Sequence, residues 1–266
     1  MAIDRLDISN TAGITAFSEK FIGGINVFIG SNATRKTTIL KCIYAACERD
    51  KIRNSVFIPV TEMLSHSRGF VAMASQYNIP FDRTQIEILV KAQMWETREI
   101  TPRNMKLLDM ISCAIDGEIA YENDTFYTVK SDGLRVEFSE EAEGYKKLGL
   151  LWKLIRNGLL ESGSVLLWDE PDAGINPELM PLLADILYEI KNGGVQIFLT
   201  THNYPLAKYL DLKQQKSDDI LFISLYKNQG NLQTSRAKKY AELKINSIEK
   251  ADEELYMAII KKLSEA

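Results

Sequence analysis

The chain has 266 residues, of which 45% are hydrophobic, and a formal net charge of −4 at pH 7. This length and apolar content suit one folded unit with a packed core, and the acidic balance does not indicate a generally basic, nucleic-acid-coated surface. No apolar run is long enough to span a bilayer and "MAIDRLDISN" has no signal core, so we expect a cytoplasmic protein that does not enter a membrane.

The chain opens with alternating apolar and polar residues in "AIDRLDISNTAGITAFSEKF", which predict an antiparallel β arm. Short, wholly apolar runs rich in β-branched and aromatic residues follow, a pattern typical of strands buried on both faces of a sheet. These runs cover residues 25–30, 55–60, 164–168 and 195–200. Helical periodicity separates them, so the order of elements predicts an α/β fold with a mostly parallel sheet and flanking helices.

Residues 81–143 have a different pattern from the rest of the chain. Helices are expected near residues 84–95 and 104–114. The following "GEIAYENDTFYTVKSDGLRVEF" alternates and turns at residues 122–124 and 131–133, as an antiparallel meander does. We therefore predict a single domain over residues 1–266, with a helical and β-meander lobe inserted at about residues 81–143.

Further helices are expected after the lobe. In "GYKKLGLLWKLIRNGLL" the apolar residues share one face, and the basic residues fit a solvated face and a DNA contact equally well. In the next helix Asn176 is the expected N-cap, Pro177 the first helical residue, and Gly193 or Gly194 the end. The C-terminal "SIEKADEELYMAIIKKLSEA" predicts an amphipathic helix with a solvated charged face. The basic residues of the first of these helices are Lys146, Lys147, Lys153 and Arg156.

The segment "FIGSNATRKTTIL" lies between a predicted strand and a predicted helix, and it departs from the phosphate-loop pattern G-x-x-x-x-G-K-[ST] at one position. In such a loop, backbone N–H groups and the helix N-terminus hold phosphates, Lys36 supplies a positive charge, and the Thr37 hydroxyl can ligate Mg²⁺. The predicted nucleotide-binding residues of this loop are Gly30, Ser31, Asn32, Ala33, Thr34, Arg35, Lys36, Thr37 and Thr38.

Arg35 stands where the pattern has its second glycine. If this position requires a positive φ, a residue other than glycine costs about 1–2 kcal/mol there and can crowd the phosphate. Conversely, a guanidinium beside a triphosphate is electrostatically favourable. The sequence leaves open which effect prevails, and also whether Arg35 is natural or introduced.

Acidic residues follow a buried strand in "SVLLWDEPDAGINP", at the edge where open parallel sheets bind ligands. Asp169 can hold Mg²⁺ through water, and Glu170 can act as the general base that polarises a water molecule. His202, at the end of the strand in "IFLTTHN", can contact a γ-phosphate and position that water. Taken singly, an acidic turn or a surface histidine is the commoner explanation. Their order along the chain favours a catalytic site.

Together, "GSNATRKT", "SVLLWDEPDAGINP" and "FLTTHN" resemble the ABC-type ATPases. The chain is similar, more specifically, to small soluble AAA-family ATP-binding proteins related to SMC-type and RecF-like ATPases, many of them found in bacterial phage-defence operons. The resemblance implies one P-loop NTPase head that takes ATP and Mg²⁺, with the nucleotide held between two head-to-tail protomers and residues 172–176 at the dimer seam. It also implies a protein effector encoded elsewhere, and it leaves DNA open as a partner.

The resemblance also assigns a place for the family's signature motif, in "FSEEAEGYKKLG". Gly144 matches the motif and is predicted to contact the nucleotide, whereas Glu143 stands where related proteins have a serine. A carboxylate repels phosphate, so a contact to the partner's nucleotide then depends on backbone N–H groups at the start of the helix. Glu62, in "VFIPVTEML", is a candidate for a Q-loop-like element.

Three functions remain open at this point. The first is a nucleotide-switched, ATP-hydrolysing dimer that controls an effector or a nucleic-acid transaction. The second is a scaffold or sensor that does not hydrolyse ATP because Arg35 impairs the loop, and Lys36→Ala should then leave its stability and partner binding unchanged. The third, less favoured, is the nucleotide-binding subunit of a membrane transporter, which would co-purify with a membrane subunit.

Overall fold

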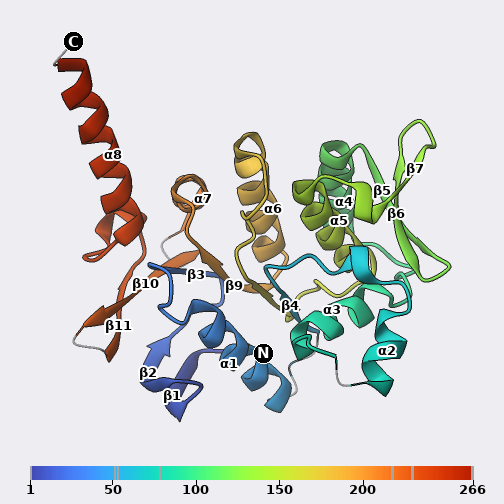
Figure 1. The fold of residues 1–266 in the computed structure, drawn as a ribbon, viewed down its shortest axis with the longest axis horizontal. Coiled ribbons are helices and arrows are strands. Elements are labelled where there is room, and N and C mark those ends of the chain that lie inside the picture. The colour runs from blue at the N-terminus through green and yellow to red at the C-terminus, as the bar shows by residue number, and fades with distance from the viewer. Residues whose placement is uncertain are drawn as a thin grey trace.

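The computed structural model describes residues 2–50, 52, 54–77, 79–216, 219–228 and 231–264. A six-stranded sheet in the order β11-β10-β3-β9-β8-β4 forms its centre. Neighbouring strands from β10 to β4 are parallel, and β11 is antiparallel to β10 at the edge. Figure 1 shows helices α4 to α7 on one side of this sheet, with α1 and the β1–β2 arm on the other.

The strands are β1 (Arg5–Thr11), β2 (Ile14–Lys20), β3 (Ile25–Ile29), β4 (Ser55–Ile58), β5 (Gly117–Glu122), β6 (Thr125–Lys130), β7 (Arg135–Glu137), β8 (Val165–Trp168), β9 (Gln196–Thr201), β10 (Ile220–Asn228) and β11 (Asn231–Ala237). The helices are α1 (Lys36–Arg49), α2 (Phe70–Gln76), α3 (Arg83–Ala92), α4 (Pro102–Ile115), α5 (Glu143–Arg156), α6 (Met180–Asn192), α7 (Tyr204–Lys213) and α8 (Ser247–Ser264).

The predicted parallel strands are confirmed as β3, β4, β8 and β9, and the predicted arm is the antiparallel pair β1–β2. The sequence analysis missed β10 and β11. The apolar run in "ILFISLY" carries the same signal as the other strands, since residues 220–225 are buried. Strand β10 matters for the site because it pairs with β3, the strand that leads into the phosphate loop.

Two apolar clusters lie on opposite faces of the sheet, because successive side chains of a strand point to opposite faces. In β3, Val27 and Ile29 join the cluster beneath helices α3 to α7, whereas Phe28 joins the cluster beneath α1 and the arm. A strand buried on both faces has no polar side, which explains why these runs show no alternation.

The helices and the meander of the predicted lobe are present as α3, α4 and β5–β6–β7. Helix α4 begins two residues earlier than expected because the Thr101 side chain accepts from Asn104 N and Pro102 occupies the first turn. Helix α3 ends at Ala92, earlier than expected. The buried side chains of both helices belong to the same cluster as α5 and α6, and the bounds 81–143 stay a prediction.

The basic residues of α5 were interpreted as a solvated face or a DNA contact, and both interpretations are wrong for its lysines. Lys146, Lys147 and Lys153 are only 7%, 5% and 4% exposed. They are neither a solvated face nor a DNA contact. Lys146 pairs with Glu143 at 2.9 Å and Lys153 pairs with Glu96 at 2.7 Å. Helical periodicity predicts only on which face of a helix a residue lies. It does not predict which carboxylates other elements of the fold bring close to a lysine.

Helix α6 starts through a 3₁₀ turn, Pro177–Leu179, so the predicted cap Asn176 belongs to that turn. Its side chain accepts a hydrogen bond from Glu178 N at 3.1 Å. At the other end Gly193 is the C-cap, and Gly194 follows with a φ of +86°. Both predicted ends are therefore within one turn of the observed ones.

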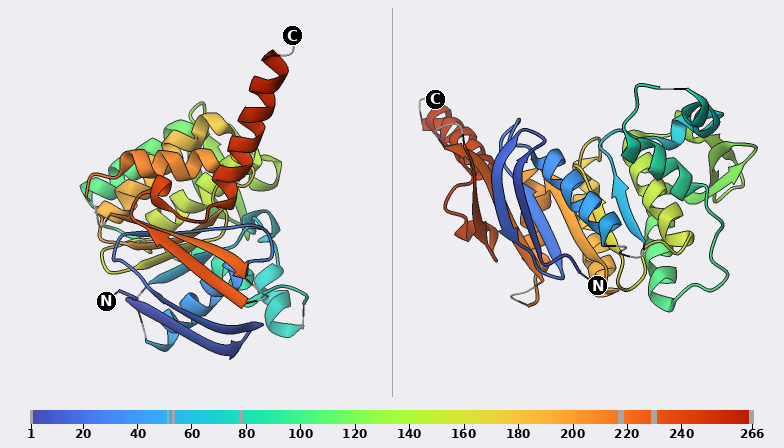
Figure 2. Two further views of the ribbon diagram at one scale, coloured as in Figure 1. Left: turned by 90° about the vertical axis from the view of Figure 1, so that its left-hand side faces the viewer. Right: turned by 90° about the horizontal axis from the view of Figure 1, so that it is seen from below.

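Helix α8 projects from the body of the molecule, as the two views in Figure 2 show. None of its described side chains is buried. Its charged face is exposed as predicted, and so are apolar residues such as Leu255 and Tyr256, at 61% and 65%. Among the described residues, no helix is long and apolar enough to cross a membrane.

Asp219 connects α6 to the start of β10. Its carboxylate accepts hydrogen bonds from Tyr188 Oη at 2.6 Å, from Lys216 N at 2.7 Å and from Lys191 Nζ. Burial opposes ionisation of Asp219, but the hydrogen bonds from Lys191 and Tyr188 outweigh it, so the pKa of this carboxyl lies below its usual value. The ionised carboxylate is therefore the form that the fold stabilises.

Asp219→Ala is expected to lower the free energy of unfolding by about 3–5 kcal/mol at neutral pH, because it leaves the half-buried Lys191 ammonium without its anion. Since the folded pKa is depressed, this stabilisation is present above about pH 4 and is lost as the pH falls through the folded pKa. Urea unfolding at neutral and acidic pH measures both effects. Glu254→Ala, in the exposed pair with Lys250, is the control, and an equal loss there would contradict the prediction.

Candidate functional site

A cleft of about 510 Å³ opens at the carboxyl ends of the parallel strands. It brings together the loop between β3 and α1, residues that follow β8 and β9, and the end of β10. Most of the residues predicted from separate motifs therefore lie in one place. The lining consists of Asn32, Ala33, Thr34, Arg35, Lys36, Thr37, Thr38, Glu170, His202 and Lys227.

The loop that leaves β3 is tightly packed. Gly30 has a φ of +146°, and a Cβ at this position would collide with Leu225 O of β10, so only glycine fits. Thr34 is 2% exposed, and its hydroxyl donates to Ser31 O at 2.8 Å. Thr37 is exposed in the cleft, at the first turn of α1. The loop thus presents the N-terminus of α1 to the cleft.

Lys36 lies folded into this loop at 6% exposure. Its Nζ donates to Gly30 O at 2.9 Å and to Ser31 O at 3.1 Å. Burial lowers the pKa of its ammonium, and the nearby Glu170 and Asp169 carboxylates partly offset that effect. A buried cation held on two carbonyls would be better stabilised by an anion, and a phosphate group meets that need.

Arg35 has a φ of +67°, in the left-handed region. The position therefore does favour glycine, and the strain considered from the sequence is present, at about 1–2 kcal/mol. The side chain turns toward the β1–β2 turn, because a Cβ added at Gly13 would lie 2.9 Å from Arg35 Nη2. The exposed guanidinium thus borders the cleft and packs against the arm.

The acidic residues at the end of β8 are held by threonines of β9. Thr200 Oγ1 donates to Asp169 Oδ1 at 2.6 Å, and Thr201 Oγ1 donates to Asp172 Oδ1 at 2.7 Å. Asp169 is 2% exposed, and burial raises the pKa of the Asp172 carboxyl. Neighbouring parallel strands place these groups side by side, so the threonines of one motif hold the acidic cluster of the other, Asp169, Glu170 and Asp172.

Glu170 and His202 face each other across the cleft, with 3.3 Å between Glu170 Oε1 and His202 Nε2. Burial first, and then Lys36, lower the pKa of the imidazole, so His202 is neutral at pH 7. Glu170 has a φ of +48°, which is unusual for a residue other than glycine. A neutral imidazole beside a carboxylate can orient a water molecule without neutralising the base.

Five predicted residues lie outside this lining: Gly30, Ser31 and Asp169, which are described above, and Gly144 and Glu62. A Cβ added at Gly144 would lie 3.3 Å from Gly174 O and from Ile175 Cα, so the start of α5 packs on the segment predicted at the dimer seam. The Glu62 carboxylate accepts hydrogen bonds from Leu64 N and Ser65 N at the start of a 3₁₀ turn, and its Q-loop-like role stays a prediction.

Lys227 lines the cleft and was not singled out in the sequence analysis. It lies near the end of β10, where it pairs with Leu232 of β11. Recognising the apolar run before it as a strand would have placed this lysine at the carboxyl edge of the sheet. The cleft therefore has cations on both sides of the loop.

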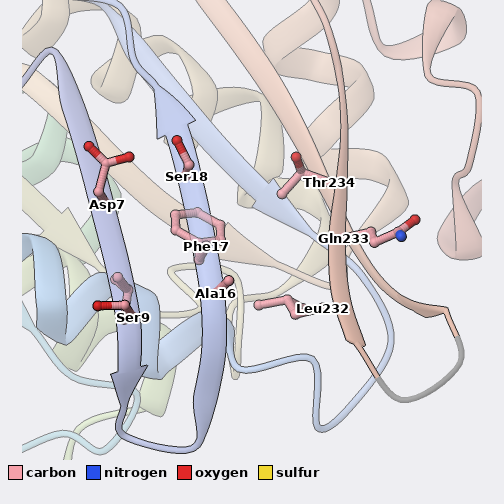
Figure 3. Close-up of a pocket in the computed structure, with 9 residues that line it drawn as sticks. Asp7, Ser9, Ala16, Phe17, Ser18, Leu232, Gln233 and Thr234 are labelled. Atoms are coloured by element: carbon pink, nitrogen blue, oxygen red, sulfur yellow. The ribbon is translucent and has the colours of Figure 1, made fainter.

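A second groove, also of about 510 Å³, lies between the arm and β11 (Figure 3). Its charged lining residue, Asp7, pairs with Arg5 at 2.8 Å. Small and apolar side chains make up most of the rest, so this groove does not have the cations that a phosphate requires. The residues labelled in Figure 3 are Asp7, Ser9, Ala16, Phe17, Ser18, Leu232, Gln233 and Thr234.

Comparison with known proteins agrees with this geometry. Residues 96–207 match a family model described as "AAA domain, putative AbiEii toxin, Type IV TA system". The chain is also 25% identical over 211 residues to the "L-cystine import ATP-binding protein TcyN" of Bacillus subtilis (strain 168), which covers 76% of this chain and 72% of that protein. This chain is related to the ABC-type ATPases.

Solved structures show the same fold. The SMC head domain from Thermotoga maritima aligns with a TM-score of 0.52 at 12% identity, over 89% of this chain and 99% of that chain. The Pyrococcus furiosus Smc head with an extended coiled coil, bound to the C-terminal domain of ScpA, gives 0.54 at 10% identity, over 98% and 99%. An ATP-binding cassette of an ABC transporter gives 0.51 at 14% identity, over 88% and 89%.

The predicted fold class is thus confirmed, since this chain has the α/β P-loop NTPase fold of ABC cassettes and SMC heads. The sheet of this chain is mostly parallel, with an antiparallel strand at one edge. In this chain, as in open parallel sheets generally, the cleft lies at the carboxyl ends of the strands.

Proposed function

We propose that this protein is an ATP-binding, ATP-hydrolysing switch that dimerises on nucleotide and acts with a partner effector in the cytoplasm. One observation carries the proposal: Lys36 of the phosphate loop lines the same cleft as Glu170 and His202. The name of the Bacillus relative, an ATP-binding protein, supports ATP as the ligand. The roles of these residues follow from their chemistry and are open to direct test.

The cleft fits a Mg-nucleotide in charge and in donor type. Positive charge around the loop comes from Arg35, Lys36 and Lys227. The Lys36 ammonium, which donates to main-chain carbonyls in this structure, can donate to a phosphate instead. The Thr37 hydroxyl and the Asp169 carboxylate are the oxygen ligands that Mg²⁺ prefers. When bound, Mg-ATP supplies the phosphoryl group and a cation that neutralises its charge.

Glu170 is the proposed general base. Its carboxylate faces the cleft beside a neutral His202, so it can accept a proton from a water molecule that the imidazole orients. The Thr200 hydroxyl, which bonds Asp169, also accepts a hydrogen bond from Glu170 N at 2.9 Å. One threonine of β9 thus orients both acidic residues.

The proposed dimer is head-to-tail, with the start of α5 of one protomer on the nucleotide of the other. Residues 172–176 border this surface, and Gly174 and Asn176 are exposed there. The Ala142 side chain caps nothing, so the first N–H groups of α5 are available to an anion. Lys146 partly neutralises Glu143, at 2.9 Å, which reduces the repulsion that this carboxylate exerts on a phosphate.

The partner effector and a role in anti-phage defence are the finer part of the proposal. The family model that matches residues 96–207 names a toxin of a Type IV TA system, which supports action together with a second protein. DNA stays open as a further partner, although the buried lysines of α5 do not offer it a surface. Co-purification of the tagged protein with its genomic neighbours tests the effector.

Calorimetric titration of Mg-ATP into the protein and its Arg35→Gly variant tests the ligand. Because Arg35 has a φ of +67°, glycine should stabilise the fold by about 1–2 kcal/mol, and both proteins should bind with affinities within about tenfold. Arg35→Ala is the matched control, since it keeps a Cβ at the strained position and removes only the guanidinium.

Two other functions would follow from other results. If only the glycine variant binds, the left-handed Arg35 has disabled the loop, and a scaffold that does not hydrolyse ATP becomes the better explanation. The name of the Bacillus relative favours a second alternative, the ATP-binding subunit of an importer. Recovery of a membrane subunit with the tagged protein would support that alternative over the switch.

A further inference from the structure

Helix α5 contains a lysine whose burial needs an explanation. Lys147 is 5% exposed, and a buried ammonium is costly unless charges and hydrogen bonds compensate for it. Its Nζ donates to Glu170 O at 2.8 Å. Burial lowers its pKa, and the Asp172 and Glu170 carboxylates act in the opposite direction. The lysine therefore lies against the acidic cluster at the end of β8.

The other buried lysines of α5 have a different kind of partner. Lys146 pairs with the side chain of Glu143, and Lys153 pairs with the side chain of Glu96. Within the part of the chain that the structure describes, Lys147 has no carboxylate oxygen within 4.0 Å, and its hydrogen bond goes to a main-chain carbonyl. A salt bridge is therefore not the reason for its position.

The carbonyl that it contacts belongs to Glu170, one of the residues of the cleft with a left-handed backbone. A φ of +48° at Glu170 costs on the order of 1–3 kcal/mol, and such strain persists only where surrounding groups hold it. Glu170 N donates to Thr200 Oγ1 at 2.9 Å, and Glu170 O accepts from Lys147 Nζ at 2.8 Å and, within the turn, from Ala173 N at 3.1 Å. Strand β9 and helix α5 thus hold the two polar groups of this residue from different sides.

We propose that Lys147 is a positioning residue, which fixes the backbone of Glu170 so that its carboxylate points at the cleft. The proposal rests on the ATPase function proposed above. Lys147 also connects the predicted dimer seam to the general base. Helix α5 begins at Glu143, whose Cβ would lie 3.2 Å from a Cβ added at Gly174 of the segment predicted at that seam. If dimer formation displaces the first turn of α5, Lys147 would transmit that displacement to the backbone of Glu170.

Lys147→Met tests the contact, since methionine keeps most of the aliphatic volume and removes the charged donor. A charge-assisted hydrogen bond lost from the position of a general base should lower kcat by about 10- to 100-fold, with KM for Mg-ATP changed less than about threefold. Lys147→Arg keeps the cation and a donor, and it should retain most of kcat. Lys153→Met is the matched control on the same helix and should retain wild-type kcat.

Hydrogen exchange gives a second readout that does not need turnover. The amides of Glu170, Asp172 and Ala173 should exchange at least about tenfold faster in Lys147→Met than in the wild-type protein, and at the wild-type rate in Lys153→Met. If the wild-type protein binds no ATP, the proposed function is wrong. The exchange rates would still show whether Lys147 holds this turn, because they do not depend on ATP binding.

The role of Lys147 is wrong if Lys147→Met folds with wild-type kcat and wild-type exchange, or if Lys153→Met loses as much kcat. Thermal melting first establishes that each variant is folded. Should the methionine variant not fold, Lys147→Gln replaces it, because glutamine is polar but too short to reach Glu170 O. The same drop in kcat is expected there, and its absence would overturn the proposal.

Discussion

Glu170→Gln should lower ATP turnover by about 10²- to 10⁴-fold and leave Mg-ATP affinity within about threefold of the wild type. Glutamine has the shape of the carboxylate and keeps the contact to His202, which is 3.3 Å away, but it cannot accept a proton from water. The loss should therefore appear in kcat. Single-turnover kinetics together with calorimetric titration separate the chemical step from binding.

The oligomeric state of Glu170→Gln in the presence of ATP gives a second test of its role as the general base. If the dimer forms on nucleotide, Glu170→Gln should accumulate as an ATP-bound dimer, detectable by sedimentation, because the step that releases it is slow. Glu189→Gln is the control and should turn over like the wild type, because Glu189 is a half-buried carboxylate of α6 that pairs with Lys106 of α4, outside the cleft. Wild-type turnover in Glu170→Gln would remove this residue from the mechanism.

Lys36→Met should weaken Mg-ATP binding by about 10- to 100-fold. The ammonium is buried in the loop on Gly30 O and Ser31 O, at the place where a phosphate would otherwise be cradled by N–H groups alone. A charge-assisted hydrogen bond to phosphate contributes about 1.5–3 kcal/mol, and each 1.4 kcal/mol is a tenfold change in affinity. Calorimetric titration measures this change directly.

The free protein should respond differently to the same substitution. Because burial lowers the pKa of Lys36, the folded loop disfavours its charged form, and Lys36→Met should leave the free energy of unfolding unchanged or slightly higher without nucleotide. Lys41→Met, on the same helix in a surface pair with Asp82, is the control for binding. Undiminished ATP affinity in Lys36→Met would favour the scaffold over the switch.

Much of the fold was predictable because it depends on local patterns. Runs such as residues 195–200 are apolar at every position, and only a strand covered on both faces stabilises such a run. The carboxyl ends of parallel strands share one edge, so Asp169, Glu170 and His202 could be placed near Lys36 before any coordinates were known. The same logic failed for β10 only because its apolar run was overlooked.

The tertiary structure alone decided the properties that depend on which distant groups meet. The backbone at Arg35 adopts a left-handed φ because the loop must return from β3 into α1, and no local pattern states that angle. The burial of Lys147 likewise depends on where α5 packs against the end of β8.

The amino-acid sequence by itself determined the parallel strands β3, β4, β8 and β9, the phosphate loop with its one departure, and the acidic and histidine residues that follow the strands. It could do so because periodicity and motif spacing are local properties of the chain. The partners of the buried lysines and the backbone strain at Arg35 and Glu170 came only from the tertiary structure. Charge compensation and backbone strain arise between residues that are distant in sequence, so they are defined only once the chain is folded.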